Sequence, residues 1–179
     1  MNSWVYKVNS RRPGLATGWH FDDFFRSRRE RSCQMGGREW IRSPQSWARL
    51  RQVRAGDLFV CYQSDERKIY GLARAEGPGY ESLTGSGIFD SVDFQPRGLR
   101  LDVPVPVAHP STRDIFGHVR AFCVPSRGTI HALRRDEIRA ILALLARSNP
   151  AQREAIVRYA EQVSARERGA GRSAKSGRK

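Results

Sequence analysis

The chain has 179 residues, of which 39% are hydrophobic, a length and composition that fit one folded domain with an appendage. Lys and Arg together number 32 against 18 Asp and Glu, so the formal net charge is +14. Arg supplies nearly all of the positive charge, and its planar, forked guanidinium suits phosphates and base edges. The longest apolar run, Ala140 to Ala146, is far short of the roughly 20 residues that span a bilayer, which excludes a helical membrane protein.

The cysteines and the N-terminal region narrow the class of protein further. Cys33, Cys61 and Cys123 are an odd number with no close spacing, which excludes a cysteine-based zinc finger and argues against a disulfide framework. No apolar segment of the kind found in a standard signal peptide follows the N-terminus. We therefore expect a basic, soluble, cytoplasmic protein.

The first part of the chain is predicted to hold one strand and two helices. Ser3 to Val8 has the pattern of a strand, with its tryptophan in the core. His20 to Arg28 predicts a short helix with three Phe on one side. Ser43 and Pro44 are the residue types favoured at a helix start, and Gly56 is the type favoured just past a helix end. A second helix is therefore predicted between them.

The middle of the chain is predicted to form the sheet. Asp57 to Gln63 is apolar on both faces, which indicates a central strand, and Ile69 to Ala75 is expected to pair with it as a hairpin. Gly77 to Gly87 is rich in turn residues and is interpreted as a loop. Leu99 to Val107 alternates, with all its Leu and Val residues on one face, and two prolines in its second half favour an edge strand.

The last part of the chain adds weaker strands and two helices. Ala121 to Val124 and Gly128 to Leu133 are weak strand candidates. Asp136 to Ala146 has the i, i+3, i+4, i+7 apolar spacing of an amphipathic helix. Asn149 begins a segment that resembles a capping box, so it predicts the start of a final helix. The predicted fold class is α+β, built around a small, curved, mostly antiparallel sheet.

Three segments are expected along the chain. Residues 1–147 would form the domain, and residues 148–168 would form a C-terminal helix packed on or beside it. Residues 169–179 contain four cations, no acid and only Gly, Ser and Ala as spacers. Such a segment has nothing to bury, so it is predicted to be a disordered basic tail.

The sequence offers no catalytic or metal-binding constellation. The histidines lack i, i+4 spacing to one another and do not neighbour cysteine, which argues against a metal site. No nucleophile elbow, phosphate-binding loop or dinucleotide fingerprint is present. The paired acids Asp22-Asp23 and Asp65-Glu66 stand beside cations, and we interpret them as solvated charge. We therefore predict no catalytic residue, no metal and no cofactor.

One stretch combines arginine with tryptophan. From Arg26 to Arg54 there are nine Arg and two acids, and Trp40 and Trp47 lie inside this stretch. Arginine with interleaved tryptophan suits a groove that follows phosphates while an aromatic face accepts a base. Trp47 lies one turn before Leu50, which favours a place in the core over a ligand contact, whereas Trp40 has polar neighbours that make burial a weaker explanation.

A series of short motifs, in order, resembles the EVE domain of the PUA-like group, whose relatives include the YTH readers of methylated adenine. The motifs are Trp4-Val5-Tyr6, Trp40, Ser46-Trp47-Ala48-Arg49, Arg54-Ala55-Gly56-Asp57, Cys61-Tyr62-Gln63-Ser64 and Ile69-Tyr70-Gly71-Leu72-Ala73. The resemblance covers residues 3–147. It departs from the family pattern at Gln63, where the family often has His, and in the long segment from Asn9 to Gly37.

The resemblance implies a small, curved β-barrel flanked by helices, with a pocket for a flipped, modified base. Trp40 would be the aromatic wall, with Trp19 and Trp47 as alternatives for that place. The other residues assigned to the pocket are Asn9, Ser43 and Ser64 for contacts to the base edge, and Tyr62 and Gln63 for the floor and rim. The residues assigned to backbone phosphates are Arg38, Arg42, Arg49 and Arg51.

The function predicted on this basis is a DNA-binding module that recognises a methylated or hydroxymethylated base in a bacterial nucleoid or phage-defence setting. RNA is an open alternative, because composition does not distinguish two polyanions. An enzyme acting on a modified nucleoside, as in ASCH-type relatives, would need a Lys with nearby Thr and Glu. Lys7 alone is a lysine on a pocket-forming strand. A basic structural protein is the remaining alternative. Because a lone reader has no output of its own, a partner such as a nuclease or motor subunit is expected.

Overall fold

The computed structural model describes residues 2–10, 20–26, 32–35, 48–84, 87–96, 98–107, 117, 119–123, 130–159 and 161. Its elements are β1 (Ser3–Val8), α1 (Phe21–Arg26), β2 (Ser32–Met35), β3 (Leu58–Gln63), β4 (Lys68–Arg74), β5 (Tyr80–Thr84), β6 (Gly87–Asp93), β7 (Leu99–Pro106), α4 (Arg120–Cys123), β8 (Ile130–Leu133), α5 (Arg135–Ser148) and the 3-10 helix η3 (Pro150–Gln152). Helical residues also occur at 48–50 and 153–159. Within the described residues, no helix is both long and apolar enough to cross a membrane.

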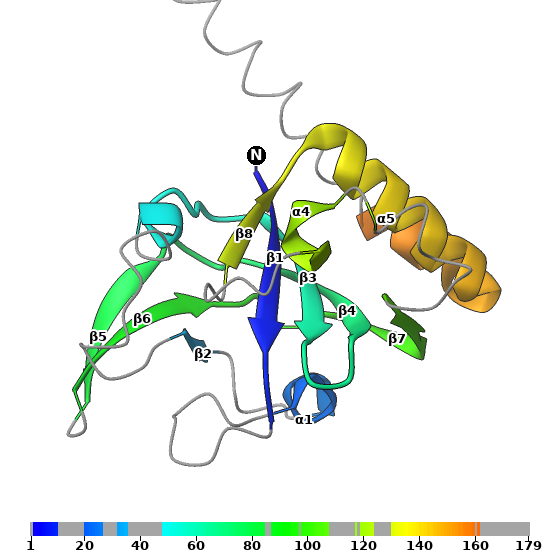
Figure 1. The fold of residues 1–179 in the computed structure, drawn as a ribbon. Coiled ribbons are helices and arrows are strands. Elements are labelled where there is room, and N and C mark those ends of the chain that lie inside the picture. The colour runs from blue at the N-terminus through cyan, green and yellow to red at the C-terminus, as the bar shows by residue number, and fades with distance from the viewer. Residues whose placement is uncertain are drawn as a thin grey trace, which may run out of the picture.

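The strands form a five-stranded sheet in the order β7-β4-β3-β1-β8 and a three-stranded sheet in the order β2-β6-β5. All six residues of β3 are buried, as expected for a central strand. β4 and β3 are antiparallel neighbours, and β7 lies at the edge, so these three predictions are confirmed. β1 runs parallel to β3, and Figure 1 shows both arrows pointing toward α1. The segments that follow β1 and β3 therefore leave the sheet at the same end.

Helices cover both faces of the five-stranded sheet. One face packs against α5 and the helical segment after it, through residues such as Leu101, Ile141 and Ile156. The other face packs against α1 and the helical turn at 48–50, with Trp4 and Phe59 at its centre. Trp4 is 1% exposed, which confirms its predicted place in the core. The mixed α+β class with a mostly antiparallel sheet is confirmed.

α1 is seated on the sheet by an aromatic ring that lies over glycine. A Cβ atom added at Gly71 would lie 2.5 Å from Cζ of Phe25 and would also meet the carbonyl oxygen of Leu99. A Cβ atom at Gly98 would lie 2.8 Å from the same ring. Since real Cβ atoms do not approach that closely, glycine at these positions allows Phe25 to contact the strand backbone directly.

Asp57 fixes the turn that leads into β3. Its carboxylate is 1% exposed and accepts three hydrogen bonds, from Asn2 N at 2.9 Å, Trp4 Nε1 at 3.0 Å and Arg54 N at 3.0 Å. The adjacent Gly56 has a φ of 83°, a left-handed conformation that favours glycine. The described helical residues before this turn end at residue 50, so the predicted helix extending to Gly56 was too long. The hydrogen bond to Arg54 N stabilises a turn in place of a further helical turn.

The outer edge of β7 is capped by two side-chain amides. Asn149 Oδ1 accepts from Val103 N at 2.8 Å, and its Nδ2 donates to Val103 O at 3.1 Å. The Gln152 amide pairs with Arg100 O and Asp102 N in the same way, at 2.9 Å each. Asn149 is the N-cap residue of η3, so the predicted helix start is confirmed, but its side chain makes no capping hydrogen bond and is used at this edge. Val103 is 57% exposed, so the predicted alternation also fails here, where a β-bulge shifts the register against β4.

Two further predictions are corrected. The segment from Gly77 to Gly87, interpreted as a loop, contains β5 and the start of β6, which pair as an antiparallel hairpin. Because this segment is rich in glycine and has no strong apolar alternation, its sequence did not indicate a strand. The weak strand predicted at Ala121 is the helix α4, whose Phe122 packs edge-on against Tyr62 with ring centroids 5.0 Å apart. The predicted tail at residues 169–179 lies outside the described residues.

Candidate nucleic-acid interface

Three of the residues predicted for the pocket meet at the carboxyl ends of β1 and β3. Asn9 follows β1, whereas Gln63 ends β3 and Ser64 follows it. The backbone N–H and the hydroxyl of Ser64 both donate to the carbonyl of Val8, at 2.7 Å and 2.8 Å. Ser64 therefore ties the two strand ends together. Its hydroxyl oxygen can still accept a hydrogen bond, so a contact to a base edge stays a prediction.

Gln63 connects this strand end to α1. The side chain is fully buried, its Oε1 accepts from Phe21 N at 3.2 Å, and its Nε2 donates to Asp65 Oδ1 at 2.6 Å. These two partners fix which end of the amide is oxygen and which is nitrogen. A histidine at this position, as in the related pattern, would present ring nitrogens instead. Gln63 therefore links the end of β3 to its surroundings by accepting one hydrogen bond and donating another.

Tyr62 lies on the other side of the strand from the α1 contacts. Its ring is 6% exposed and belongs to the apolar cluster under α5. Lys7 Nζ is 6.0 Å from the centroid of this ring. Burial raises the pKa of the Tyr62 hydroxyl, although Arg67 acts in the opposite direction. Tyr62 is therefore a neutral, packed side chain at this end of the sheet, and its predicted role in the pocket floor stays a prediction.

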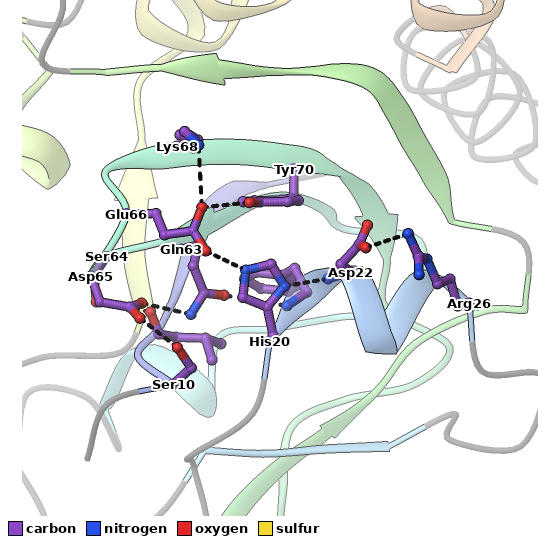
Figure 2. Close-up of polar contacts among 12 residues, drawn as sticks. Ser10, His20, Asp22, Arg26, Gln63, Ser64, Asp65, Glu66, Lys68 and Tyr70 are labelled. Carbon is purple, nitrogen blue, oxygen red and sulfur yellow. Dashed lines mark hydrogen bonds and ion pairs between the residues drawn. The ribbon is translucent and has the colours of Figure 1, made fainter.

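A hydrogen-bond network joins the start of α1 to the connection between β3 and β4 (Figure 2). Glu66 is at its centre, with Oε1 2.7 Å from His20 Nε2 and with Oε2 accepting the Tyr70 hydroxyl at 2.6 Å. Lys68 Nζ donates to the same Oε2 at 3.3 Å. Because the N–H of Asp22 donates to His20 Nδ1 at 3.0 Å, the neutral ring carries its proton on Nε2 and donates it to Glu66.

The surroundings keep Glu66 ionised and Tyr70 protonated. Hydrogen bonds from Tyr70, His20 and Lys68 hold the pKa of the Glu66 carboxyl below its ordinary value, although partial burial acts in the opposite direction. Burial and the adjacent Glu66 carboxylate raise the pKa of Tyr70 well above its ordinary value. A carboxylate with a lowered pKa is a weak base, and a phenol with a raised pKa is a weak acid. Near neutral pH the pair therefore serves as a fixed anchor.

Asp65 forms a second anchor beside the first. Its carboxylate accepts hydrogen bonds from the Ser10 hydroxyl and from the Gln63 amide (Figure 2). Burial acts to raise the pKa of Asp65, but the hydrogen bonds from Ser10 and Gln63 outweigh it, so the pKa lies below its ordinary value. The interpretation of Asp65-Glu66 as solvated charge is therefore wrong. Both carboxylates hold segments that flank the predicted pocket.

Asp22 clamps α1 from the other side. Its Oδ1 lies 2.8 Å from Nε and 2.6 Å from Nη2 of Arg100 on β7. Its Oδ2 lies 2.8 Å from Nη2 of Arg26, one turn along the helix. The start of α1 is thus held by β3, by the β3–β4 connection and by β7, which gives residues 20–22 a fixed position beside the strand ends.

Two of the four predicted phosphate-binding arginines are described. Arg49 Nη1 donates to the carbonyl of Ile130 at 2.9 Å and lies 3.3 Å from His131 Nδ1. Arg49 therefore links the helical turn at 48–50 to β8, a role that the sequence did not indicate. Arg51 is exposed. The other predicted residues lie outside the described part of the chain, and they are Trp19, Arg38, Trp40, Arg42, Ser43 and Trp47.

The sequence analysis did not identify His20, Tyr70 or Ser10 as part of this end of the molecule. His20 and Glu66 are 46 residues apart, so no local spacing connects them. The signals that were present are the paired acids and Tyr70 inside the Ile69–Ala73 motif. Within the described residues, no group of three or more His, Cys, Asp or Glu side chains is placed to hold a metal ion.

Comparison with known proteins identifies the architecture. No protein-family model matches the sequence, and no curated protein matches it. Solved structures do match. Human THYN1, in a complex with DNA containing 5-methylcytosine, superposes with a TM-score of 0.60 over 81% of this chain and 98% of that chain, at 16% identity. The DUF55 domain of human thymocyte nuclear protein 1 gives 0.59 over 80% and 98%, at 17% identity.

This is the EVE-domain fold. A protein from Agrobacterium tumefaciens matches it as well, with a TM-score of 0.59, 18% identity, and coverage of 81% of this chain and 93% of that chain. The shared fold confirms the α+β architecture that the sequence motifs implied. These matches extend over nearly the whole length of the related chains.

Proposed function

We propose that this EVE-fold chain is a non-catalytic nucleic-acid-binding protein that takes a modified base, such as a methylated or hydroxymethylated base of DNA, into a pocket at the ends of β1 and β3. The observation that carries the proposal is the similarity of fold to human THYN1, which was solved with 5-methylcytosine-containing DNA. The net charge of +14 supports a polyanionic partner. Its arginine-rich composition supports contacts to phosphates and base edges.

The chemistry of the strand ends supports binding over catalysis. His20 uses both ring nitrogens in hydrogen bonds within the protein, and Glu66 accepts from three side chains. A general base needs a lone pair directed at the substrate and a pKa near the working pH. The lowered pKa of Glu66 and the raised pKa of Tyr70 act against proton transfer at neutral pH. Such a network instead holds a pocket in a preformed shape, which reduces the entropy lost on binding.

The pocket itself would combine aromatic walls with short polar groups. An extruded base presents two π faces and one hydrogen-bonding edge. We assign the aromatic wall to Trp40, and the edge contacts to Asn9 and Ser64. Gln63 and Asp65 would stabilise the segments that carry Asn9 and Ser64. Gln63 accepts a hydrogen bond from Phe21 N of α1, and Asp65 accepts one from the Ser10 hydroxyl. The cations Arg51 and Arg49 would add attraction to phosphates without reading sequence.

Binding measurements with the purified full chain test this function. The ligands are matched DNA and RNA oligonucleotides, single- and double-stranded, each with unmodified cytosine or adenine and with the methylated or hydroxymethylated base, at one salt concentration. We expect tighter binding to a modified DNA than to its unmodified counterpart. Equal and weak affinity for all of them would contradict the proposal and leave a basic structural protein. A preference for modified RNA would move the function to RNA, and turnover of the modified nucleoside would show an enzyme.

We further place the protein on the bacterial nucleoid, with a separate effector such as a nuclease or motor subunit. The reason for expecting an effector is that a domain that only reads a base has no output of its own. Cross-linking in cells followed by identification of the linked DNA and protein tests both points. If neither nucleic acid nor an effector protein were linked to the chain, both points would be contradicted.

A further inference from the structure

We infer that the outer face of α5 carries a second nucleic-acid contact, which binds the phosphate backbone without regard to base and is separate from the base pocket. The contact is the α5 arginine ridge, defined as Arg135, Arg139 and Arg147. It goes beyond the proposed function, because it needs no modified base.

Helix geometry places the three arginines on the exposed side of the helix, in a row that turns by about 40° at each four-residue step. They follow one another at intervals of four and eight residues, and the position between the last two is Ala143. All four are exposed, whereas Ile138, Ile141, Leu144 and Leu145 are buried on the opposite side of the helix. At about 1.5 Å rise per residue the ridge is about 18 Å long. One strand of a duplex carries a phosphate roughly every 3.4 Å along its axis, so a ridge of this length runs beside several phosphates.

Two of the three arginines, Arg139 and Arg147, form no ion pair within the described part of the chain. The exposed Asp136 lies 3.4 Å from Arg134, and Glu137 is buried and accepts from Arg134 N at the helix start. The sequence beyond residue 161 adds six cations and one acid. The C-terminal part of the chain is therefore a second region of excess positive charge.

Helix stability does not explain the ridge. A cation in the last turn, such as Arg147, interacts favourably with the helix dipole. Arg135 occupies the first helical position, where the same dipole makes a cation unfavourable. The helix dipole therefore accounts for a cation at Arg147 but gives no reason for one at Arg135.

The exposed chemistry of α5 favours nucleic acid over a lipid surface. A helix that lies on a membrane presents large apolar side chains next to its cations. The exposed large hydrophobic residues of the described chain are Tyr80, Val103 and Val157, and α5 contains none of them. Arginine, with its forked guanidinium, is suited to bind phosphate in two places at once.

The ridge is on the opposite side of the sheet from α1, whose start adjoins the strand ends proposed for the base pocket. α5 packs on one face, through the cluster that contains Ile141, and α1 packs on the other, through the cluster that contains Phe21. Figure 1 shows α5 and α1 well apart, at the top and the foot of the view. The ridge can therefore hold the protein on nucleic acid while the pocket is empty, which allows it to search unmodified sequence.

The test uses the full chain and an unmodified DNA duplex, with affinity measured over a range of salt concentrations. The double variant Arg139→Ala/Arg147→Ala removes two phosphate contacts, so we expect the slope of log affinity against log salt to fall by about 1.8, at about 0.9 per contact. The Lys double variant, Arg139→Lys/Arg147→Lys, keeps both charges and should keep the slope. The ratio of affinities for modified and unmodified duplex should not change in either variant.

A gain of charge provides the matched control. Ala143→Arg completes the ridge and should steepen the slope by about 0.9. Ala155→Arg adds the same charge at an exposed alanine on the following helical segment and should leave the slope unchanged. Three results would overturn the inference: an unchanged slope in the Ala double variant with native circular dichroism, equal effects of Ala143→Arg and Ala155→Arg, or binding to anionic phospholipid vesicles as tight as to duplex. A protein with no preference for modified bases would still give a valid result here, because the ligand is unmodified.

Discussion

The variant Asp57→Ala tests how much the buried Asp57 carboxylate, which accepts three hydrogen bonds, stabilises the fold. The substitution removes one side chain and leaves three donors without their acceptor, namely the N–H groups of Asn2 and Arg54 and the indole N–H of Trp4. The indole is buried, so its loss costs about 1–3 kcal/mol, and each of the two part-buried amides costs about 1 kcal/mol because water reaches it. The free energy of unfolding should therefore fall by about 3–5 kcal/mol in total.

Thermal unfolding followed by circular dichroism measures this loss. For a chain of this length, 1 kcal/mol corresponds to about 2–4 °C in Tm, so the expected decrease in Tm is roughly 10 °C. A double-mutant cycle with Trp4→Phe isolates the indole bond. Once Trp4 has been replaced by Phe, Asp57→Ala should cost less, by about 1–2 kcal/mol. A Tm within about 2 °C of the wild-type value for Asp57→Ala would refute the reasoning.

Three further predictions follow from the geometry. Gly71→Ala should destabilise the protein by about 1–3 kcal/mol, because its Cβ would meet the Phe25 ring. The control Gly77→Ala should not, because its Cβ would meet nothing within 4 Å. Equal denaturation midpoints for the two variants would contradict this prediction. Glu66→Gln should cost stability at pH 7. Because the folded pKa of Glu66 is lowered, the difference from wild type should shrink as the pH falls below 4.5, and a constant difference in pH-dependent melts would argue against it. Truncation after Arg168 should leave Tm unchanged and lower the salt slope on duplex DNA by up to about 3.6; a lower Tm would show that the tail packs on the domain.

The fold was largely predictable because its main signals are local. β3 is apolar on both faces, the β4 pairing follows from a short polar connection, and α5 carries its apolar stripe in sequence. The features that were missed depend on contacts between distant segments. Asn149 is a good helix cap by residue type, yet the β7 edge 46 residues away takes its amide. α4 is a single helical turn whose Phe122 is held by Tyr62, and a four-residue sequence does not specify that choice.

At the candidate site, the sequence predicted residue positions only where a motif included them. Gln63 and Ser64 were identified from the strand-end motif, and the structure places both at the ends of β1 and β3. The network of His20 and Glu66 was not predicted. The residues next to each of them in sequence give no sign of the contact, which joins segments 46 residues apart. The role of Arg49 at β8 was hidden for the same reason, since Ile130 lies 81 residues further along the chain.

The central claim is that the EVE-fold chain reads a modified base through an aromatic wall, and the affinity ratio between modified and unmodified DNA measures it most directly. The measurement compares the wild-type protein with Trp40→Ala and Trp40→Phe, with circular dichroism to confirm folding. Stacking of a base on an aromatic ring contributes about 1–3 kcal/mol, so Trp40→Ala should remove a preference of roughly 5- to 150-fold, while affinity for unmodified DNA changes little. Trp40→Phe should retain part of the preference. A wild-type protein that binds modified and unmodified DNA equally, or a folded Trp40→Ala protein that keeps the full preference, would contradict the account.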